Sequence, residues 1–408
     1  MSDLITASKY CDSVFDGTHD TPKPVEAGRL LITSKHISGG KLDVSTAYMI
    51  SEKDYCSIQK RSSVSQWDIL FSMIGSVGEV YLEKNDNITY AIKNIGVFSC
   101  KDEYRAKWLY YYLLSPSAKN HIIRYLNGAV QKFLPLGALR SFPVIPFNDD
   151  KKILVGVLEN IDRKIEINRG LSLALVEMSK SIYDYWFMQF NFPISTELAI
   201  ALGDSTLEGR PYKTSGGKMV DHPTQKRKIP EGWLVKRLDE LAKVKAGGDR
   251  PALFSTKITD TFSIPIYSNG IDDEGLYGYT TEATINSPSV TISARGSIGY
   301  TVLRMKPFTP IIRLIVVTPR IPNSIQYVYE YIKSMGHSKS GSVQQQLTAP
   351  LVSSMKILEP SRYVLEKYAE VTTPITREIE IIKEENVKLS ELRDWLLPML
   401  MNGQVTVK

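Results

Sequence analysis

The chain contains the segment Ile74-Gly75-Ser76-Val77-Gly78-Glu79-Val80, and a second copy of it decides the fold. The copy reads Arg295-Gly296-Ser297-Ile298-Gly299-Tyr300-Thr301 and lies 221 residues further on, counted from Gly75 to Gly296. Each copy follows a run typical of a strand, Asp68–Ser72 and Ser289–Ser293. Two glycines three residues apart, with no helix opening after them, predict a tight turn rather than a cofactor-binding loop.

Two further pairs of similar segments occur in the same order at nearly the same spacing. Gly128–Gln131 is matched by Gly341–Gln344, and Arg163–Ile167 is matched by Arg377–Ile381. Short matches arise by chance, but an ordered set with one period above 200 residues indicates a duplicated unit rather than a solenoid.

Each unit ends in a long helical pattern whose apolar positions alternate by three and four residues, which is typical of a helix that packs on another helix. In the first unit these seam positions are Leu154, Leu158, Ile161, Ile165 and Asn168, then, after one slip, Leu171, Leu175, Met178 and Ile182. In the second unit they are Leu365, Tyr368, Thr372, Ile375, Ile379, Ile382, Asn386 and Leu389. The second helix is expected to begin or kink at Pro374. The amides of Asn168 and Asn386 would fix the register.

The predicted fold class is therefore α+β, with two similar mixed α/β globular domains separated by two long antiparallel helices that form a coiled-coil spacer. The shorter helical runs Tyr104–Leu114 and Ser324–Ser334 belong to the globular parts. The expected boundaries are residues 1–150 for the first globular domain, 151–193 for the central helix, 194–228 for a loop or linker, 229–360 for the second domain and 361–408 for the C-terminal helix. The linker is basic, and a solvated linker is preferred over a DNA-binding arm.

Composition describes a globular protein with no membrane association. Hydrophobic residues make up 43% and charged residues 23%, and the net charge of +6 permits a polyanionic partner. No apolar run approaches the roughly 20 residues of a membrane helix. The first residues lack the order of a signal peptide, so a cytoplasmic location is expected. Cys11, Cys56 and Cys100 are widely spaced, which favours reduced thiols over a disulfide framework or a zinc site.

Catalytic motifs are missing from the sequence. It has no GxxxxGK[ST] phosphate loop, no HExxH and no GxSxG, and its five histidines show no metal-ligand spacing. The glycine-containing cofactor loop and the Asn/Asp-Pro-Pro-aromatic segment of a DNA methyltransferase are also missing. We therefore expect neither an enzyme nor a cofactor or metal in this chain.

Polar and basic residues interleaved with glycine and aromatics suit loops that approach a DNA duplex. Arg, Lys, Asn and Gln read base edges, whereas Lys, Ser and Thr hold phosphates. The candidates in the first unit are Thr18, His19, Thr33, Ser34, Lys35, Lys41, Lys60, Arg61, Ser76, Lys93, Asn94, Gln131 and Lys132. The candidates in the second unit are Arg250, Lys257, Ser268, Asn269, Tyr277, Tyr279, Arg295, Ser297, Arg313, Lys339, Gln344 and Gln345.

An ordered set of segments resembles the specificity subunits of type I restriction-modification systems over nearly the full chain. In chain order, the segments that carry the resemblance are Gly17-Thr18-His19-Asp20-Thr21-Pro22, Leu31–Lys35, Asp68–Gly78, Asn127–Lys132, Lys164-Ile165-Glu166, Tyr185-Trp186-Phe187, Asn191-Phe192-Pro193, Ile229–Trp233, Ile266-Tyr267-Ser268 and Leu392–Pro398. The second unit departs from the pattern because it lacks the Gly-Thr-His-Asp opening.

The resemblance implies that each globular part is a target recognition domain that reads one half of a bipartite, gapped site in double-stranded DNA. The helices would fix the spacing and dock two modification (methyltransferase) subunits, which bring S-adenosylmethionine. Motor-nuclease (restriction) subunits would add ATP- and Mg-dependent translocation and cleavage. Residues near the helix ends are expected to face these partners: Trp186, Phe187, Trp395 and Leu396.

Three alternatives stay open at this point. The four apolar residues could instead complete the core of the spacer. The chain could be a coiled-coil scaffold that does not bind DNA. It could also serve as the specificity subunit of another modification-based defence system, which shares every feature described above.

Overall fold

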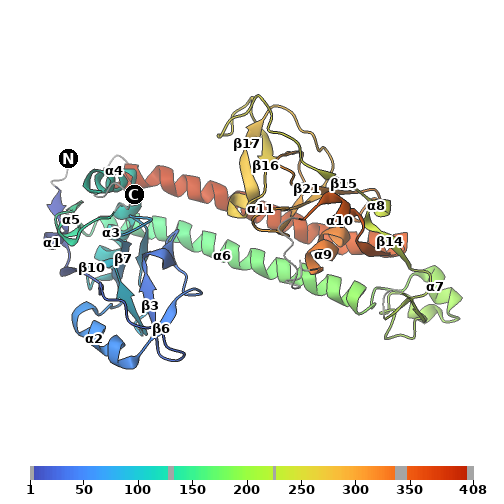
Figure 1. The fold of residues 1–408 in the computed structure, drawn as a ribbon, viewed down its shortest axis with the longest axis horizontal. Coiled ribbons are helices and arrows are strands. Elements are labelled where there is room, and N and C mark those ends of the chain that lie inside the picture. The colour runs from blue at the N-terminus through green and yellow to red at the C-terminus, as the bar shows by residue number, and fades with distance from the viewer. Residues whose placement is uncertain (1–3, 127–132, 224–226, 336–346, 402–408) are drawn as a thin grey trace. The chain divides into compact units, whose positions relative to one another are not determined.

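The computed structural model describes residues 4–126, 133–223, 227–335 and 347–401 (Figure 1). The chain divides into two compact units. Unit 1 comprises residues 1–169 and 383–408, and unit 2 comprises residues 170–382. The two longest helices, α6 (Lys151–Tyr183) and α11 (Arg362–Met401), each contribute residues to both units.

Unit 1 contains a four-stranded sheet and a three-stranded sheet. The first has the order β2 (Ser13–Asp16), β10 (Ile95–Ser99), β7 (Asp68–Ser72) and β8 (Val80–Leu82). The second has the order β6 (Tyr48–Ile50), β3 (Arg29–Thr33) and β9 (Tyr90–Lys93), with β3 and β9 parallel. Two-residue ladders join β1 (Ile5–Thr6) to β11 (Pro143–Val144) and β4 (Ile37–Ser38) to β5 (Lys41–Leu42).

Five short helices complete the globular part of unit 1: α1 (Ala7–Tyr10), α2 (Glu52–Ser62), α3 (Glu103–Leu114), α4 (Pro116–Tyr125) and α5 (Leu136–Arg140). Side-chain caps start three of them, since Ser51, Asp102 and Ser115 accept hydrogen bonds from first-turn N–H groups. The main core packs α3 on the four-stranded sheet and includes Trp108, whose indole N–H donates to Ile145 O.

Unit 2 repeats the same sheets. Its four-stranded sheet has the order β15 (Ala242–Ala246), β21 (Ile315–Pro319), β18 (Ser289–Ile292) and β19 (Thr301–Arg304). Its three-stranded sheet has the order β17 (Leu276–Thr280), β16 (Ile264–Tyr267) and β20 (Thr309–Pro310), with β16 and β20 parallel. β14 (Leu234–Arg237) pairs with β22 (Lys356–Glu359), as β1 pairs with β11.

The helices of unit 2 follow the same order: α8 (Leu238–Leu241), α9 (Ile325–Ser334) and α10 (Ala349–Ser353) take the places of α1, α3 and α5. The duplication expected from the sequence is therefore confirmed at the level of strand order and direction. The predicted class of two mixed α/β domains with two long helices is confirmed as well.

The two long helices run antiparallel in unit 1. Asp162 pairs with Arg393 (Oδ1 to Nη1, 3.0 Å), whereas Asn168, six residues later in α6, contacts Asn386, seven residues earlier in α11. The Asn168 side chain is 2% exposed, and its Nδ2 donates to Asn386 Oδ1 at 3.0 Å. Asn168 therefore lies in the seam as expected, and the structure adds that its amide contacts that of Asn386.

Two details of the helices differ from the sequence-based expectation. The seam of α6 does not slip after Asn168, because Leu171 and Met178 are 44% and 52% exposed. It continues through Ser172 and Ser179, and Ser179 Oγ donates to Glu330 Oε1 at 3.2 Å. The pattern of apolar residues was misleading here because small polar side chains occupy the seam.

The second difference concerns Pro374. α11 begins at Arg362 and continues through the proline, so the expectation that the helix begins there is wrong. Pro374 lies on an exposed face of the helix between the buried residues Thr372 and Ile375.

The stretch expected to be a linker holds regular structure. α6 passes into a π-helical turn (η2, Asp184–Met188), followed by α7 (Thr196–Ala201), a 3₁₀ turn (η3, Ser205–Leu207) and a hairpin of β12 (Met219–Asp221) with β13 (Lys228–Pro230). The ring of Tyr212 stacks on Phe192, which stacks on Trp233. Widely spaced aromatic residues therefore give this glycine-rich segment a core that local composition did not reveal.

Candidate nucleic-acid interface

In unit 1, strand ends from both sheets meet at one edge. β3 and β9 are parallel, with Thr33 paired to Lys93, so Ser34 and Asn94 follow at the same edge. β2 ends there too, since Gly17 N donates to Ile95 O (2.8 Å). Loops at the ends of neighbouring strands place side chains on a rigid support, which suits recognition of a ligand.

His19 is held at this edge by two side chains. Its Nδ1 lies 2.7 Å from Asn94 Oδ1, and its Nε2 lies 3.2 Å from Asp16 Oδ2. Asn94 adopts a left-handed backbone conformation (φ 53°), and its carbonyl accepts a hydrogen bond from Ser34 Oγ at 2.9 Å. These contacts fix an imidazole and an amide side by side at the surface. The amide can bond to base edges or phosphates, whereas the imidazole, whose two nitrogens both have partners, does so by exchanging one of these contacts.

Cations surround this pair. Arg61 reaches the other oxygen of Asp16 (3.4 Å), and Lys93 Nζ donates to Thr21 Oγ1. Lys35 in the 3₁₀ turn η1 (Ser34–His36) and Lys60 at the end of α2 are exposed. The structure therefore brings together eight predicted residues of unit 1: Thr18, His19, Thr33, Ser34, Lys35, Arg61, Lys93 and Asn94.

Ser76 lies at the same end of the four-stranded sheet as this group, whereas Lys41 contacts α6. Ser76 is exposed in the turn after β7, at the edge where Ser72 pairs with Ile95, so it belongs to the same end of the four-stranded sheet. Lys41 instead forms an ion pair with Glu166 of α6 (3.2 Å), which lowers the pKa of that carboxyl. Lys41 thus ties the β4–β5 hairpin to the helix.

Unit 2 has the equivalent edge, and Asn269 organises it. The Asn269 amide donates from Nδ2 to Ile312 O (2.7 Å) and accepts at Oδ1 from Ala294 N (2.7 Å). One side chain therefore joins the loop after β16 to the loops after β18 and β20. The predicted residues Ser268, Arg295, Ser297 and Arg313 occupy these loops.

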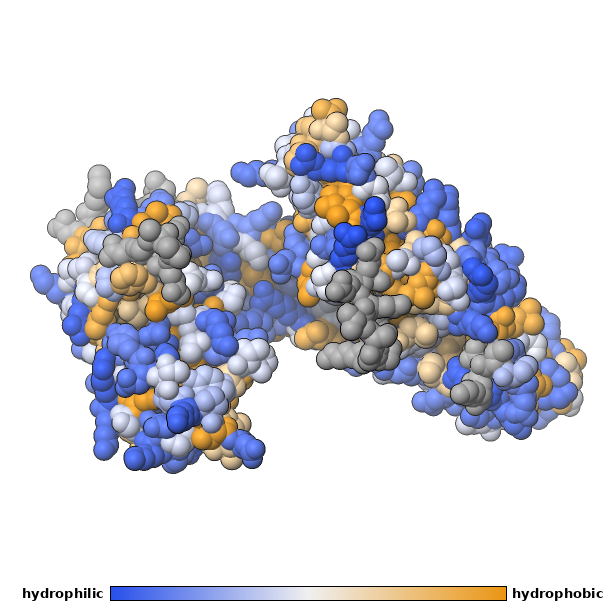
Figure 2. Space-filling model, viewed as in Figure 1, coloured by the Kyte–Doolittle hydropathy of each residue, from blue (hydrophilic) through white to orange (hydrophobic). Residues whose placement is uncertain are grey.

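A second group in unit 2 lies on the loop before β16 and on β17. Arg250 Nη1 donates to Tyr277 Oη (3.1 Å), and its guanidinium lies 4.1 Å from the centroid of the Phe254 ring. Tyr279 lies two residues further along β17, beyond a bulge at Tyr277, and Lys257 is exposed. Figure 2 shows hydrophobic residues at the tip of unit 2 beyond β16 and β17. Two apolar residues of the loop before β16, Leu253 and Ile258, are exposed.

Gly247-Gly248 takes the place of Gly17-Thr18 in unit 2. Gly247 N donates to Leu314 O, as Gly17 N donates to Ile95 O, both at 2.8 Å. A Cβ atom would lie 2.5 Å from Ile92 O at Gly17 and 2.8 Å from Pro310 O at Gly247, so neither position accepts a side chain. Sequence reasoning missed this match because only the glycine is shared, although a strand-like run precedes it in both units.

Five predicted residues, Gln131, Lys132, Lys339, Gln344 and Gln345, lie outside the described residues. The residues that follow those segments are placed equivalently. Leu134 N donates to Met73 O, and Leu347 N donates to Ala294 O.

The four residues expected to face partners have different environments. Phe187 is 2% exposed, and its ring packs on Tyr327 and Tyr368, so it belongs to the core of unit 2. Trp186 and Leu396 are partly buried against the cores of their own units. Trp395 is 56% exposed and is the member of the set that is available to a partner.

No group of three or more His, Cys, Asp or Glu side chains among the described residues could hold a metal ion. No helix among those residues has the length and hydrophobicity needed to cross a membrane.

A known protein family matches most of the chain. The family model for the type I restriction modification DNA specificity domain matches residues 24–177 and 230–391, together more than three quarters of the chain. The two matches fall in the two copies of the duplicated sequence.

Individual relatives carry the same description. The chain is 20% identical to a type I restriction enzyme specificity subunit of Haemophilus influenzae, over 85% of this chain and 88% of that one. It is 22% identical to one from Methanocaldococcus jannaschii, over 83% and 78%. A type I specificity subunit of Mycoplasma pneumoniae is 30% identical over 140 residues, and that match spans only 42% of the relative.

A solved structure has the same fold. The crystal structure of the S subunit of a type I restriction-modification system from M. genitalium superimposes with a TM-score of 0.56 at 15% identity. The alignment covers 98% of this chain and 96% of that one.

Proposed function

The chain belongs to the family of DNA specificity subunits of type I restriction-modification systems, and from this premise we propose that each of its units reads one half of a bipartite DNA site. The observation that carries the proposal is that each unit has an equivalent edge. The same strand ends meet in both, and each edge presents a different set of polar and basic side chains. Different sets suit half-sites of different sequence.

In unit 1 the reading groups are His19 and Asn94, with Lys35, Arg61 and Lys93 as phosphate contacts. In unit 2 the reading groups lie on the loops clamped by Asn269 and around Arg250. Each correctly read base pair contributes about 1–3 kcal/mol of discrimination, so several such groups are needed on each half-site.

The helices α6 and α11 serve this function as the spacer and as the docking site for two modification subunits. At 1.5 Å per residue, 33 and 40 residues correspond to roughly 50 and 60 Å. Exposed apolar side chains on both helices, among them Ile167, Leu171 and Trp395, suit a protein partner. The modification subunits supply S-adenosylmethionine and adenine methylation. The restriction subunits supply ATP- and Mg-dependent cleavage, so this chain has no catalytic role.

Methylation mapping tests the proposal. DNA is taken from cells that express this chain with its modification subunit, and a strain lacking only this chain is the control. We expect a gapped, bipartite adenine motif that is missing from the control. An active modification subunit that binds the chain yet leaves no such motif would contradict the proposal and favour a scaffold without DNA binding.

Side-chain replacements test the assignment of the two edges. His19→Ala is expected to relax the motif in one half only, and Arg250→Ala in the other, so each variant is the matched control of the other. Exchange of residues 1–150 for those of another family member is expected to change one half-site. A change in both halves would refute the modular assignment.

A further inference from the structure

Unit 2 contains a pocket that none of the predicted contacts uses. It has a volume of about 260 Å³ and lies against β15 and β21. A water occupies about 30 Å³ of liquid volume, so the pocket has room for a phosphate group and several waters. Its polar lining comes from two lysines, three hydroxyl residues and one amide: Lys243, Lys245, Thr284, Ser287, Thr318 and Asn286.

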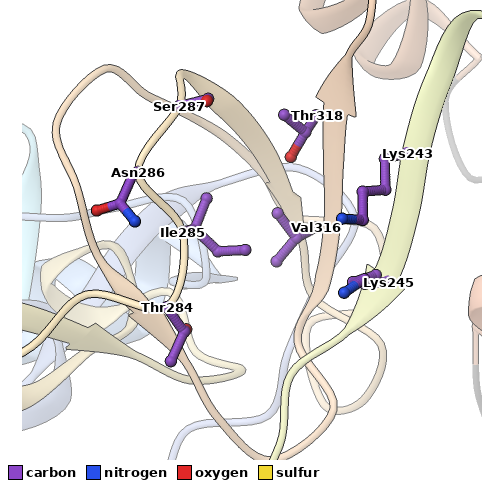
Figure 3. Close-up of a pocket in the computed structure, with 8 residues that line it drawn as sticks. All are labelled: Lys243, Lys245, Thr284, Ile285, Asn286, Ser287, Val316 and Thr318. Atoms are coloured by element: carbon purple, nitrogen blue, oxygen red, sulfur yellow. The ribbon is translucent and has the colours of Figure 1, made fainter.

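The two lysines share one face of an edge strand. β15 pairs with β21 so that Lys243 lies opposite Thr318 and Lys245 opposite Val316. Val244 lies between them and packs against the core on the other face. In Figure 3 the lysines extend from their strand, and the loop with Thr284, Asn286 and Ser287 lies on the other side of Val316.

This loop is held by the second sheet. Ile285 and Phe308 exchange backbone hydrogen bonds of 3.0 Å, and Thr284 N donates to Thr309 Oγ1 (3.2 Å). The pocket therefore lies between the β15–β21 part of the four-stranded sheet and this loop, whose position is set by its contacts with Phe308 and Thr309.

The charge of the pocket is not neutralised. Its lining contains no Asp or Glu. Both lysines are exposed, and neither has a hydrogen bond or ion pair with another residue in the described part of the chain. A lysine ammonium carries three donors on a flexible stem, which suits a phosphate oxygen approaching from several directions.

Unit 1 fills the equivalent space. Gly17 corresponds to Gly247, so Phe15, two residues earlier, corresponds to Lys245. Phe15 packs against an apolar cluster that includes Val64, which follows α2, and Val97 of β10. The duplicated fold thus has a hydrophobic contact in one copy and a lysine-lined pocket in the other.

We propose that this pocket of unit 2 binds a backbone phosphate of the DNA, beside the loops that read bases. The inference rests on the proposed function. From Lys245 to Gly248 the chain advances three residues, about 10 Å at strand spacing. A duplex carries about one negative charge per 1.7 Å of its axis, so a duplex on the candidate edge places phosphates within this distance. Lysines on an edge strand also hinder pairing between molecules, but that role requires neither a pocket nor hydroxyl groups.

The test measures DNA affinity against salt concentration for the chain bound to its modification subunits. The slope of log K against log salt is negative, and each lost phosphate contact reduces its magnitude by about 0.9. Lys243→Gln with Lys245→Gln is therefore expected to reduce the magnitude by about 1–2. Affinity should fall equally for cognate and unrelated duplexes, because phosphate contacts carry no sequence information. Lys245→Arg is expected to keep the slope. Lys245→Phe, which introduces the residue of unit 1, is expected to reduce its magnitude while preserving the fold.

The control is Lys236→Gln with Lys356→Gln, which removes the same charge from the β14–β22 ladder, where Lys236 forms an ion pair with Glu359 (2.7 Å). A pocket variant with the wild-type slope would overturn the phosphate assignment and leave the proposed function intact. A wild-type complex that binds no duplex would instead refute both. If inorganic phosphate shifts the NMR signals of the two ammonium groups while the variant binds DNA normally, the pocket serves free phosphate compounds, which would also overturn the assignment.

Discussion

Replacing Asn168 with alanine tests whether the contact between the amides of Asn168 and Asn386 stabilises the helix pair of unit 1. The Asn168 side chain is 2% exposed and donates to Asn386 Oδ1 (3.0 Å) and to Glu385 Oε2 (2.7 Å). The substitution leaves the Asn386 carbonyl without this partner. Loss of one partner of a buried hydrogen bond costs about 1–3 kcal/mol. We count nothing for Glu385, whose carboxylate is solvated.

The assay is hydrogen exchange resolved by peptide, because a chain with two units need not unfold in one step. About 1–3 kcal/mol corresponds to roughly 5- to 150-fold faster opening. The acceleration is expected in peptides of residues 151–169 and 383–401. The matched control is Ile167→Ala, which truncates the neighbouring exposed side chain and is expected to change exchange by less than about twofold.

Equal exchange in Asn168→Ala and the wild type would refute the reasoning, and so would equal acceleration in Ile167→Ala. The double change to leucine at Asn168 and Asn386 adds a second measurement. It is expected to restore or raise stability while weakening the register, because apolar seam residues pack well but do not specify alignment. Unchanged assembly with the modification subunits would then show that the amides have no role in alignment.

Three further outcomes are expected. Ile382→Glu buries a charge at the seam, so it should destabilise unit 2 by about 3 kcal/mol or more and reduce co-purification with partner subunits. Ile381→Glu, at an exposed position, should do neither. Thermal unfolding and pull-down measure the two effects, and equal behaviour of the two variants would contradict the assignment of Ile382 to the seam. Burial raises the pKa of Asp68 to about 6. The contribution of this group to the free energy of unfolding should therefore be greatest below about pH 4 and fall as the pH rises toward 6. If Asp68→Asn shows the same decline in a pH series, Asp68 is not its cause. Cys56 is exposed, whereas Cys11 and Cys100 are buried. A thiol reagent should therefore label one cysteine of three in the native chain and all three in denaturant. Labelling of more than one cysteine in the native chain would contradict this packing.

The sequence predicted the fold well because the fold depends on periodic patterns and on repetition. The run Asp68–Ser72 is followed by turn glycines, as is its match at residues 289–293. The two strands, β7 and β18, take the same place in the four-stranded sheets of the two units. The seam of α11 was predicted correctly because its apolar positions hold the register on their own. The seam of α6 was not, since Ser172 and Ser179 are recognised as seam residues only through their tertiary partners.

The candidate site was predicted in part, for a similar reason. His19, Asn94 and Lys93 were found because they follow glycines or strand-like runs, which mark loops at strand ends. Asp16, which holds both His19 and Arg61, was missed because an acidic residue is not expected in a DNA-binding group. Lys243 and Lys245 were missed because alternating lysines on a strand are ordinary solvent-facing residues until the pocket beside them is known.

The two units show why duplication suits recognition of two unrelated half-sites. Backbone hydrogen bonds and the cores fix the strand order and the meeting of strand ends, and the glycines at positions 17 and 247 are required by close approach to neighbouring backbone. None of these constraints acts on the side chains that project from the edge. The edge therefore carries His19 beside Asp16 in unit 1 and Arg250 over Phe254 in unit 2, with the same strand order behind both. The exchange of Phe15 for Lys245 extends this freedom to one face of the four-stranded sheet. In unit 1 Phe15 packs there against a cluster that includes Val64, whereas in unit 2 the lysine lines a pocket.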